Sequence, residues 1–297
     1  MISLKKIKLV NYCGFKDFEL DFTDGQDVKK WAMFYGPNGS FKSTLLRAID
    51  LLASPIRFFE KNNVMTFRRL KHHRDYAYGV EAMYTDANGL KMEAVFFDGE
   101  KDKTVIFEDN IKGIIYAGRK ANEEKGEISG VRLNELEPCE EGIVFIDADN
   151  RNMMHKFQII KELQDPFCDF AAAVYGFNCY CPAESLVNDP SGINYLMDFV
   201  IEKPGGMKVH YKRFSDGEKK IATLVSSLFK RVHKDSPDKE GRGIIALDNI
   251  AMHIYFKRHM ELIRKIEEYF PEQQIIATTH SPVIINEMDK KYLINME

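Results

Sequence analysis

The apolar and polar positions of the chain repeat with two periods, which predict strands in some segments and helices in others. Period-two runs at residues 2–10 and 17–22, and the apolar run "WAMFY" at 31–35, predict strands. A helical period begins near Lys42 and ends at Ala53, before Ser54-Pro55. The first segments therefore predict a buried strand that leads through a short loop into a helix.

The middle of the chain changes character. Residues 76–146 contain short apolar runs separated by Asn-Gly, Asp-Gly or charged turns, which predicts an antiparallel β region. Residues 120–141 are polar and rich in glutamate, so we expect a surface loop there. The mixed pattern of residues 151–202 is interpreted as mostly helical.

The last third alternates between a helix at 215–234, a strand at 243–247, a helix at 253–270 and a strand at 274–278. The helix at 253–270 is expected to bury one apolar stripe, made of Phe256, Met260, Ile263, Ile266 and Phe270. Strand–helix alternation at both ends, with a β-rich middle, predicts an α/β fold whose parallel strands come from distant parts of the chain.

Composition narrows the class of protein. The 297 residues carry a formal net charge of −3, which gives no overall attraction to nucleic acid or membranes. The cysteines are dispersed, neither a signal peptide nor an apolar segment of ~20 residues is present, and we expect a cytoplasmic protein with reduced thiols. The basic run "RRLKHHR" at 68–74 is either a local contact for phosphates or a solvated helix end.

The segment "GPNGSFKST" stands between the predicted strand and the predicted helix, which is typical of a phosphate-binding loop. In such a loop, backbone N–H groups and a helix N-terminus surround the β- and γ-phosphates. Lys42 adds a positive charge, and the Ser43 hydroxyl can bind Mg²⁺. Phe41 replaces the glycine that is usual before the lysine, so its side chain must point away from the phosphates and needs its own space. The candidate ATP-binding residues are Gly36, Pro37, Asn38, Gly39, Ser40, Phe41, Lys42, Ser43 and Thr44.

A second motif, "FSDGEKK", begins the predicted helix at 215–234. Ser215 and Glu218 have the spacing of a capping box, with Asp216 and Gly217 between them. The same helix N-terminus is suited to an anionic phosphate held by a second copy of the protein. The two interpretations are compatible.

Two apolar strands end in polar residues that can act on a phosphate. "GIIALDN" ends in Asp248, and "QIIATTHSP" is followed by His280. Ligands bind at the carboxyl ends of parallel strands, where Asp248 can hold Mg²⁺ and a neutral His280 can hydrogen-bond a γ-phosphate or the attacking water. "GIVFIDADN" also ends in carboxylates, Asp147 and Asp149, but no histidine-bearing strand follows it at comparable spacing, so we set it aside.

The four motifs, in this order, resemble the ATP-binding-cassette (ABC) ATPase head of the RecF, SMC and OLD families. "GPNGSFKST" is similar to the phosphate loop, "FSDGEKK" to the signature motif, "IIALDN" to the Mg²⁺-binding aspartate and "ATTHSP" to the histidine switch. The opening "KIKLVNYCGFKDFELDF" also resembles the first strands of those heads. The resemblance implies a P-loop NTPase with a mixed or parallel core sheet and one ABC-type domain over 1–297. Within it we expect a β-rich lobe at 1–150, a helical signature-bearing lobe at 151–235, and strands at 236–297 that complete the sheet.

The resemblance also implies a homodimer that binds ATP and Mg²⁺ between its subunits. Lys42 and Ser43 of one copy would face residues 215–218 of the other, and Asp248, Asn249 and His280 would act in hydrolysis. Hydrolysis would move the heads apart and serve DNA repair or anti-phage defence through a partner effector. Asn249 stands where the family usually has a glutamate, and losing a general base typically costs ~10²–10⁴-fold, so we expect slow turnover.

Other functions stay open at this point. A nucleotide-gated scaffold or sensor with negligible turnover is consistent with Phe41 and Asn249. A transporter ATPase subunit is less favoured, because the "THSP" segment is untypical and no glutamine between Thr44 and Asn150 can serve as the family's Mg²⁺-sensing residue. The short stretch after His280 has no room for the nuclease module of OLD proteins, so a nuclease would be a separate subunit. DNA contact is expected only as a local surface of the dimer.

Overall fold

The computed structural model describes residues 2–53, 90–109, 143–147, 157–188, 190, 193–233 and 243–297. The chain divides into two compact units, one made of Met1–Lys30 and Asn38–Ile143, the other of Trp31–Pro37 and Val144–Glu297. The phosphate loop crosses from the second unit to the first between Pro37 and Asn38.

The first unit is built on an antiparallel sheet with the strand order β2-β1-β6-β7. Its strands are β1 (Ser3–Tyr12), β2 (Phe15–Asp21), β6 (Leu90–Phe97) and β7 (Asp102–Asp109). Ile7 and Leu9 of β1 are fully buried, as the alternation of apolar and polar residues predicts, and Leu4 is buried as well because the register of the strand shifts between Leu4 and Lys6. Helix α1 (Lys42–Ala53) contacts β6 and β7, and a short hairpin joins β3 (Thr23–Asp24) to β4 (Asp27–Val28). The strands expected at 2–10 and 17–22 and the helix expected from Lys42 are confirmed.

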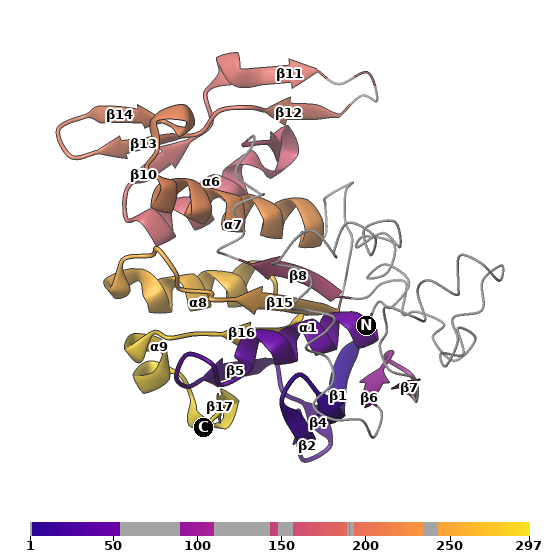
Figure 1. The fold of residues 1–297 in the computed structure, drawn as a ribbon. Helices are drawn as coiled ribbons and strands as arrows, with labels where there is room; N and C mark the ends of the chain where they lie inside the picture. Colours follow the sequence, from indigo (N-terminus) through magenta and orange to yellow (C-terminus); the bar gives the residue numbers. More distant parts are fainter. Residues whose placement is uncertain are drawn as a thin grey trace, which may run out of the picture. The chain divides into compact units, whose positions relative to one another are not determined.

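The second unit contains a five-stranded sheet with the order β17-β5-β16-β15-β8 (Figure 1). Its strands are β5 (Trp31–Tyr35), β8 (Ile143–Asp147), β15 (Ile244–Asp248), β16 (Gln274–Thr278) and β17 (Leu293–Asn295). The pairings β15–β16, β16–β5 and β17–β5 are parallel, so the expected parallel sheet from distant segments is confirmed. All residues of β15 and β16 are buried, as expected for parallel strands covered on both faces.

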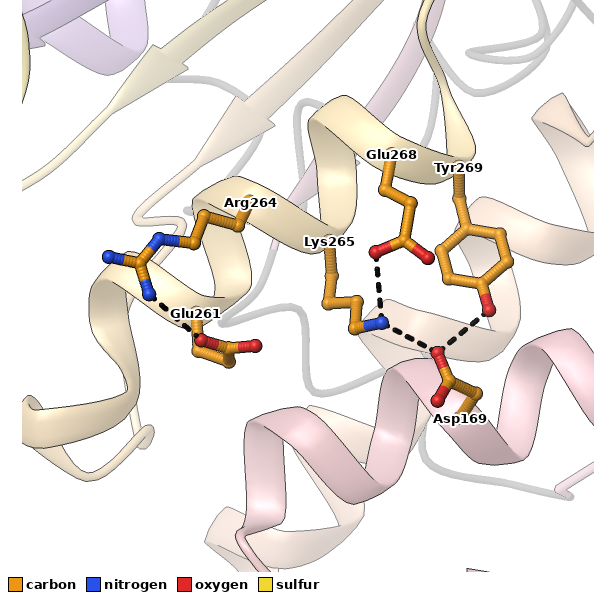
Figure 2. Close-up of polar contacts among 6 residues, drawn as sticks. All are labelled: Asp169, Glu261, Arg264, Lys265, Glu268 and Tyr269. Carbon is orange, nitrogen blue, oxygen red and sulfur yellow. Dashed lines mark hydrogen bonds and ion pairs between the residues drawn. The ribbon is translucent and has the colours of Figure 1, made fainter.

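Helices of the second unit pack through their apolar faces and through one polar cluster. They are α6 (Gln164–Tyr175), α7 (Asp216–Val232), α8 (His259–Tyr269) and α9 (Pro282–Glu287), and α6 contacts both α7 and α8. Figure 2 shows Asp169 of α6 between two side chains of α8. Its carboxylate accepts hydrogen bonds from Lys265 Nζ at 2.6 Å and from the Tyr269 hydroxyl at 2.8 Å, and Lys265 also donates to Glu268 at 2.9 Å.

Two expectations for this unit are wrong. Residues 151–202 are not mostly helical in their described part, because besides α6 they form β9 (Ile159–Ile160), β10 (Asn178–Tyr180), β11 (Leu186–Asn188), β12 (Asn194–Leu196) and β13 (Val200–Lys203). These strands form two small sheets, β10-β13-β14 and β11-β12-β9, with β14 at Met207–His210. Strands of two to four residues are fixed by their pairing partners, which a local pattern does not show.

The helix expected from residue 253 begins instead at His259, and a 3₁₀ turn at Phe256–Arg258 precedes it. Phe256 is therefore outside the apolar stripe and is exposed, whereas Ile263, Ile266 and Phe270 are buried as expected. The basic run at 68–74, the polar segment at 120–141 and Asp149 lie outside the described residues. The division of the chain at residues 150 and 235 stays a prediction.

Candidate functional site

Three candidate site residues lie at one edge of the five-stranded sheet. Because β5, β16 and β15 are adjacent and parallel, their carboxyl ends point to the same edge, where ligands bind in open α/β sheets. Gly36 follows β5 directly, Asp248 is the last residue of β15, and His280 follows β16 by two positions. The structure thus brings together the phosphate-loop entry, the candidate Mg²⁺ ligand and the candidate histidine switch, all within the second unit.

Asp248 is buried and is fixed by a threonine of the neighbouring strand. The Thr278 hydroxyl donates a hydrogen bond to the Asp248 carboxylate and accepts one, at 2.8 Å, from the backbone N–H of Asn249. The backbone N–H of Ile250 donates to the Thr278 carbonyl at 3.0 Å. Thr278 therefore sets the positions of both Asp248 and Asn249, although no sequence motif points to it.

Asn249 has a left-handed backbone, with φ of 53°. Asparagine tolerates this region better than glutamate does, because its short polar side chain can satisfy the local backbone. The backbone at this position thus suits the residue that departs from the family pattern.

The segment that carries His280 is held on both sides, while His280 itself is exposed. The backbone N–H of Thr279 donates to the Phe34 carbonyl of β5 at 3.0 Å. Ser281 caps α9, since its hydroxyl accepts from the backbone N–H of Ile284 at 3.1 Å.

A buried histidine that sequence reasoning missed completes this support. His259 lies with Nε2 2.9 Å from the Ile254 carbonyl and with Nδ1 2.6 Å from the Ser281 hydroxyl oxygen. A carbonyl oxygen only accepts, so Nε2 carries a proton, and in the neutral ring Nδ1 accepts from the serine. The start of α8 is thereby tied to the residue after His280. Only the tertiary contact identifies His259, because its neighbours in sequence have no site motif.

Two glycines of the candidate phosphate loop have positive φ angles. Gly36 and Gly39 have φ of 146° and 84°, and among the described residues no atom beyond Gly39 and its two neighbours lies within 4 Å of a Cβ built on Gly39. Glycine at position 39 is therefore required by the backbone conformation and not by lack of space. Helix α1 begins at Lys42, where the backbone N–H of Leu45 donates to the Phe41 carbonyl at 2.9 Å.

The donor groups in this loop fit a polyphosphate with Mg²⁺. Lys42 is 6% exposed and its ammonium donates to the Ser40 hydroxyl at 3.1 Å. The first turn of α1, which is described in full, contains no acidic residue, so the helix N-terminus is electropositive. No cluster of three His, Cys, Asp or Glu side chains that could hold a metal is found in the described part of the chain.

Phe41 finds its space beside the turn between β1 and β2. Its ring lies against Gly14, and its centroid is 5.5 Å from that of Phe15. The expectation that the Phe41 side chain needs a place of its own is thus met by the turn of a neighbouring hairpin. The ring stays 45% exposed.

The signature motif begins α7 with the predicted capping box. The Ser215 hydroxyl accepts from the backbone N–H of Glu218 at 3.3 Å, and the Glu218 carboxylate accepts from the backbone N–H of Ser215 at 2.8 Å. Burial alone would raise the pKa of Glu218, but hydrogen bonds from Lys203 and Ser215 outweigh it and lower the pKa. Ser215 and Asp216 are exposed, so this helix start is accessible from outside its own unit.

The carboxylates set aside earlier are only partly described. Strand β8, which ends in Asp147, lies beside β15 at the margin of the same sheet.

The helices that the structure describes are each too short or too polar to span a membrane. A cytoplasmic location stays a prediction, as do the roles of the individual site residues.

The sequence of the chain is similar to one protein family and to several known proteins. Residues 194–286 match the family described as "AAA domain, putative AbiEii toxin, Type IV TA system". The chain is 32% identical over 111 residues to the "Retron Vc95 probable ATPase" of Vibrio cholerae serotype O1 biovar El Tor. The aligned region covers 32% of this chain and 21% of that protein. It is 22% identical over 301 residues to the "Septu protein PtuA" of Bacillus thuringiensis, which covers 96% of this chain and 73% of that protein. The chain thus spans about a fifth of the retron ATPase and about three quarters of this PtuA.

Solved structures show the same fold over nearly the whole chain. The SMC head domain from Thermotoga maritima has a TM-score of 0.55 at 17% identity, covering 98% of this chain and 94% of that one. The Smc head of Pyrococcus furiosus bound to the C-terminal domain of ScpA has a TM-score of 0.54 at 12% identity, covering 99% and 93%. The chain thus has the fold of the SMC head domains, which is a P-loop NTPase fold.

Proposed function

We propose that two copies of this chain bind ATP with Mg²⁺ between them and hydrolyse it slowly, in the service of anti-phage defence. The observation that carries the proposal is the edge of the sheet at which Gly36, Asp248 and His280 follow three adjacent parallel strands. The similarity to proteins named Septu PtuA and retron ATPase supports a role in defence.

Within one copy, each candidate residue has a distinct task. Lys42 and the N-terminus of α1 bind the β- and γ-phosphates, since both are positive and the first turn of α1 has no acidic residue. Ser43 and Asp248 hold Mg²⁺, which when bound offsets the negative charge on the phosphates. His280, exposed at the sheet edge, hydrogen-bonds the γ-phosphate.

Asn249 limits the rate of hydrolysis in this proposal. Its amide positions the attacking water but takes no proton from it at neutral pH, so the step lacks a general base. A nucleotide-gated sensor with negligible turnover is the second candidate function, and the same residue favours it. Turnover and nucleotide-dependent dimerisation, measured on one preparation, separate the two candidates.

The second copy contributes the start of α7. Its helix N-terminus is exposed, and the capping box orders its first turn before any ligand arrives. An N-terminus of this kind binds an anionic group, so it receives the γ-phosphate held by Lys42 of the other copy.

A separate protein partner is part of the proposal. The solved SmcHead structure is a head bound to the C-winged helix domain of ScpA, so this fold supports partner binding in that protein. For the present chain we propose a separate effector, which is a nuclease where a neighbouring gene encodes one, with DNA contact confined to a surface of the dimer. Cells that carry the gene with its neighbours should lose phage protection when Lys42 is replaced by alanine.

The shared site is tested by mixing two inactive variants. Lys42→Ala removes the phosphate-binding charge, and Ser215→Asp keeps a good N-cap residue while placing a carboxylate where the other copy's phosphate would lie. Each variant alone should lack turnover, and the mixture should regain part of it, because one of the two sites in a mixed dimer is intact. Ser215→Asn, which also caps well but adds no charge, is the matched control.

Light scattering with and without ATP reports dimerisation in the same samples. A mixture that stays inactive, although both variants fold and mixed dimers form, would refute the shared site. A wild-type protein that binds no nucleotide would refute the proposal as a whole.

A further inference from the structure

Phe41 adopts a backbone conformation that a bulky residue rarely takes. Its φ is 60°, in the left-handed region, where the side chain of a non-glycine residue meets its own backbone. The residue stands directly before Lys42, and its carbonyl accepts the hydrogen bond from Leu45 that begins α1. A strained position at the start of this helix persists only when surrounding contacts hold it.

The contact that holds Phe41 comes from the turn between β1 and β2. A Cβ atom added to Gly14 would lie 2.6 Å from Cζ and 2.8 Å from Cε1 of the Phe41 ring. No side chain fits at Gly14 while the ring keeps its place, so the ring occupies the space that a side chain there would fill. Gly14 also has φ of 99°, which glycine adopts without strain.

The ring also joins a row of aromatic side chains. Its centroid is 5.5 Å from that of Phe15, and the Phe15 centroid is 4.7 Å from that of Phe18 in β2. Phe15 is buried, so the row connects the core of the hairpin to the half-exposed ring in the loop. Tilted aromatic pairs at these separations attract one another beyond the area that they bury.

We propose that the contact between Phe41 and Gly14 positions the phosphate loop for nucleotide, with Phe41 as a positioning residue. The ring, held by the hairpin turn, keeps the backbone before Lys42 left-handed, as the missing glycine otherwise would. Nucleotide affinity is therefore coupled to the β1–β2 turn. This inference rests on the proposed nucleotide-binding function.

Three variants of Phe41 separate the ring from the backbone. Phe41→Ala removes the ring but keeps a residue that is strained at this φ, so the dissociation constant for a non-hydrolysable ATP analogue should rise roughly 10-fold. Phe41→Gly removes the ring and the strain together, so its affinity should stay within about threefold of the wild type. Phe41→Tyr keeps the ring and should bind like the wild type.

A double-mutant cycle with Gly14 tests the contact itself. Gly14→Ala should weaken nucleotide binding roughly 10-fold, because the new Cβ displaces the ring. Gly14→Ala in the Phe41→Gly background should have no further effect on affinity, since no ring remains to displace. The alanine is strained at φ of 99° in both backgrounds, so this shared cost cancels in the cycle.

The outcomes distinguish this inference from the proposed function. Calorimetric titration of the wild type and of Lys42→Ala establishes first whether the loop binds nucleotide. If the wild type binds and Lys42→Ala does not, equal affinities of Phe41→Ala and the wild type would overturn the positioning role. That comparison does not depend on whether Gly14→Ala folds. A wild type that binds no nucleotide would overturn both proposals.

Discussion

The phosphate loop and the sheet edge that carries Asp248 and His280 are kept in shape by different forces. In the loop, left-handed backbone angles at Gly39 and Phe41 and one half-exposed ring set the conformation. At the edge, a buried hydroxyl group joins two strands, since Thr278 is hydrogen-bonded to both Asp248 and Asn249.

The difference predicts how each region responds to substitution. Packing and backbone angles tolerate any residue that allows the same conformation, so the loop can differ from the common pattern at Phe41. A buried hydroxyl that donates and accepts at once has few substitutes, because its loss removes two hydrogen bonds together. We therefore expect the loop to be sensitive at its charge and the edge to be sensitive at its hydroxyl groups.

The largest effect is expected where the loop carries its charge. Lys42→Ala should weaken binding of a non-hydrolysable ATP analogue roughly 100-fold or more, because a buried cation that meets phosphate is lost. Arg47→Ala, an exposed change on the same helix, is the control and should leave the dissociation constant within about twofold. Equal affinities of the two variants, measured by calorimetric titration, would remove the loop from the site.

The next largest effect is expected on ATP turnover when Asn249, at the sheet edge, is replaced. Asn249→Glu should raise the ATP turnover number by roughly 10-fold or more, because a carboxylate can accept the proton of the attacking water. The left-handed backbone will cost this variant about 1 kcal/mol of folding stability, so unfolding must be measured beside turnover. Turnover unchanged in Asn249→Ala would contradict the role given to this position.

A substitution of Thr278 tests the hydrogen bonds at the sheet edge without changing a residue that is proposed to bind phosphate or Mg²⁺. Thr278→Val keeps the shape but removes the hydroxyl, so the free energy of unfolding should fall by about 1–3 kcal/mol in urea titrations. Thr223→Val is the control, since the Thr223 hydroxyl donates to the Lys219 carbonyl within α7 and hydrogen-bonds Tyr211, and neither of these residues is a candidate site residue. Equal losses in the two variants would show that the link to Asp248 and Asn249 has no special weight.

The smallest effect is expected at the polar cluster between α6 and α8, which belongs neither to the phosphate loop nor to the sheet edge. The hydrogen bond from Lys265 lowers the pKa of Asp169 most, with a further contribution from Tyr269. A lowered pKa stabilises the fold at pH values above the usual carboxyl range, and this contribution is lost as the pH falls through the folded-state pKa. Because Asp169 is half-exposed and solvent screens it, Asp169→Asn should cost only about 0.5 kcal/mol at pH 7.

The difference between the wild type and Asp169→Asn should shrink when unfolding is repeated near pH 3. A gap that stays constant between the two pH values would mean that packing, not charge, accounts for it. Either result leaves the phosphate loop and the sheet edge untouched, so this pair of measurements gives the baseline for the larger effects.

The sequence predicted the parts of the site that local chemistry specifies. Strand, glycine-rich loop and helix in the order 31–35, 36–41 and Lys42–Ala53 follow from periodicity and turn residues, and the structure confirms them. The capping box of Ser215 and Glu218 could also be predicted from the sequence, because both partners lie within one helical turn.

What the sequence could not show depends on contacts between distant segments. Thr278 is one more residue in an apolar strand until its neighbour Asp248 is placed beside it. The place of the Phe41 ring depends on Gly14, which no periodicity connects to the loop. The late start of α8 has a similar cause, because His259 is held by Ser281 and Ile254 and the residues before it turn to reach that position.

The place of β5 in its sheet has a consequence for how the protein forms during synthesis. Trp31, Ala32, Met33 and Phe34 are fully buried, yet the strands on both sides of β5 are β16 and β17, which the ribosome makes much later. At ~5–20 residues per second, the interval between Tyr35 and Gln274 lasts on the order of ten to fifty seconds. Throughout that time the nascent chain exposes an apolar strand with two unpaired edges, which makes it a natural client for a chaperone.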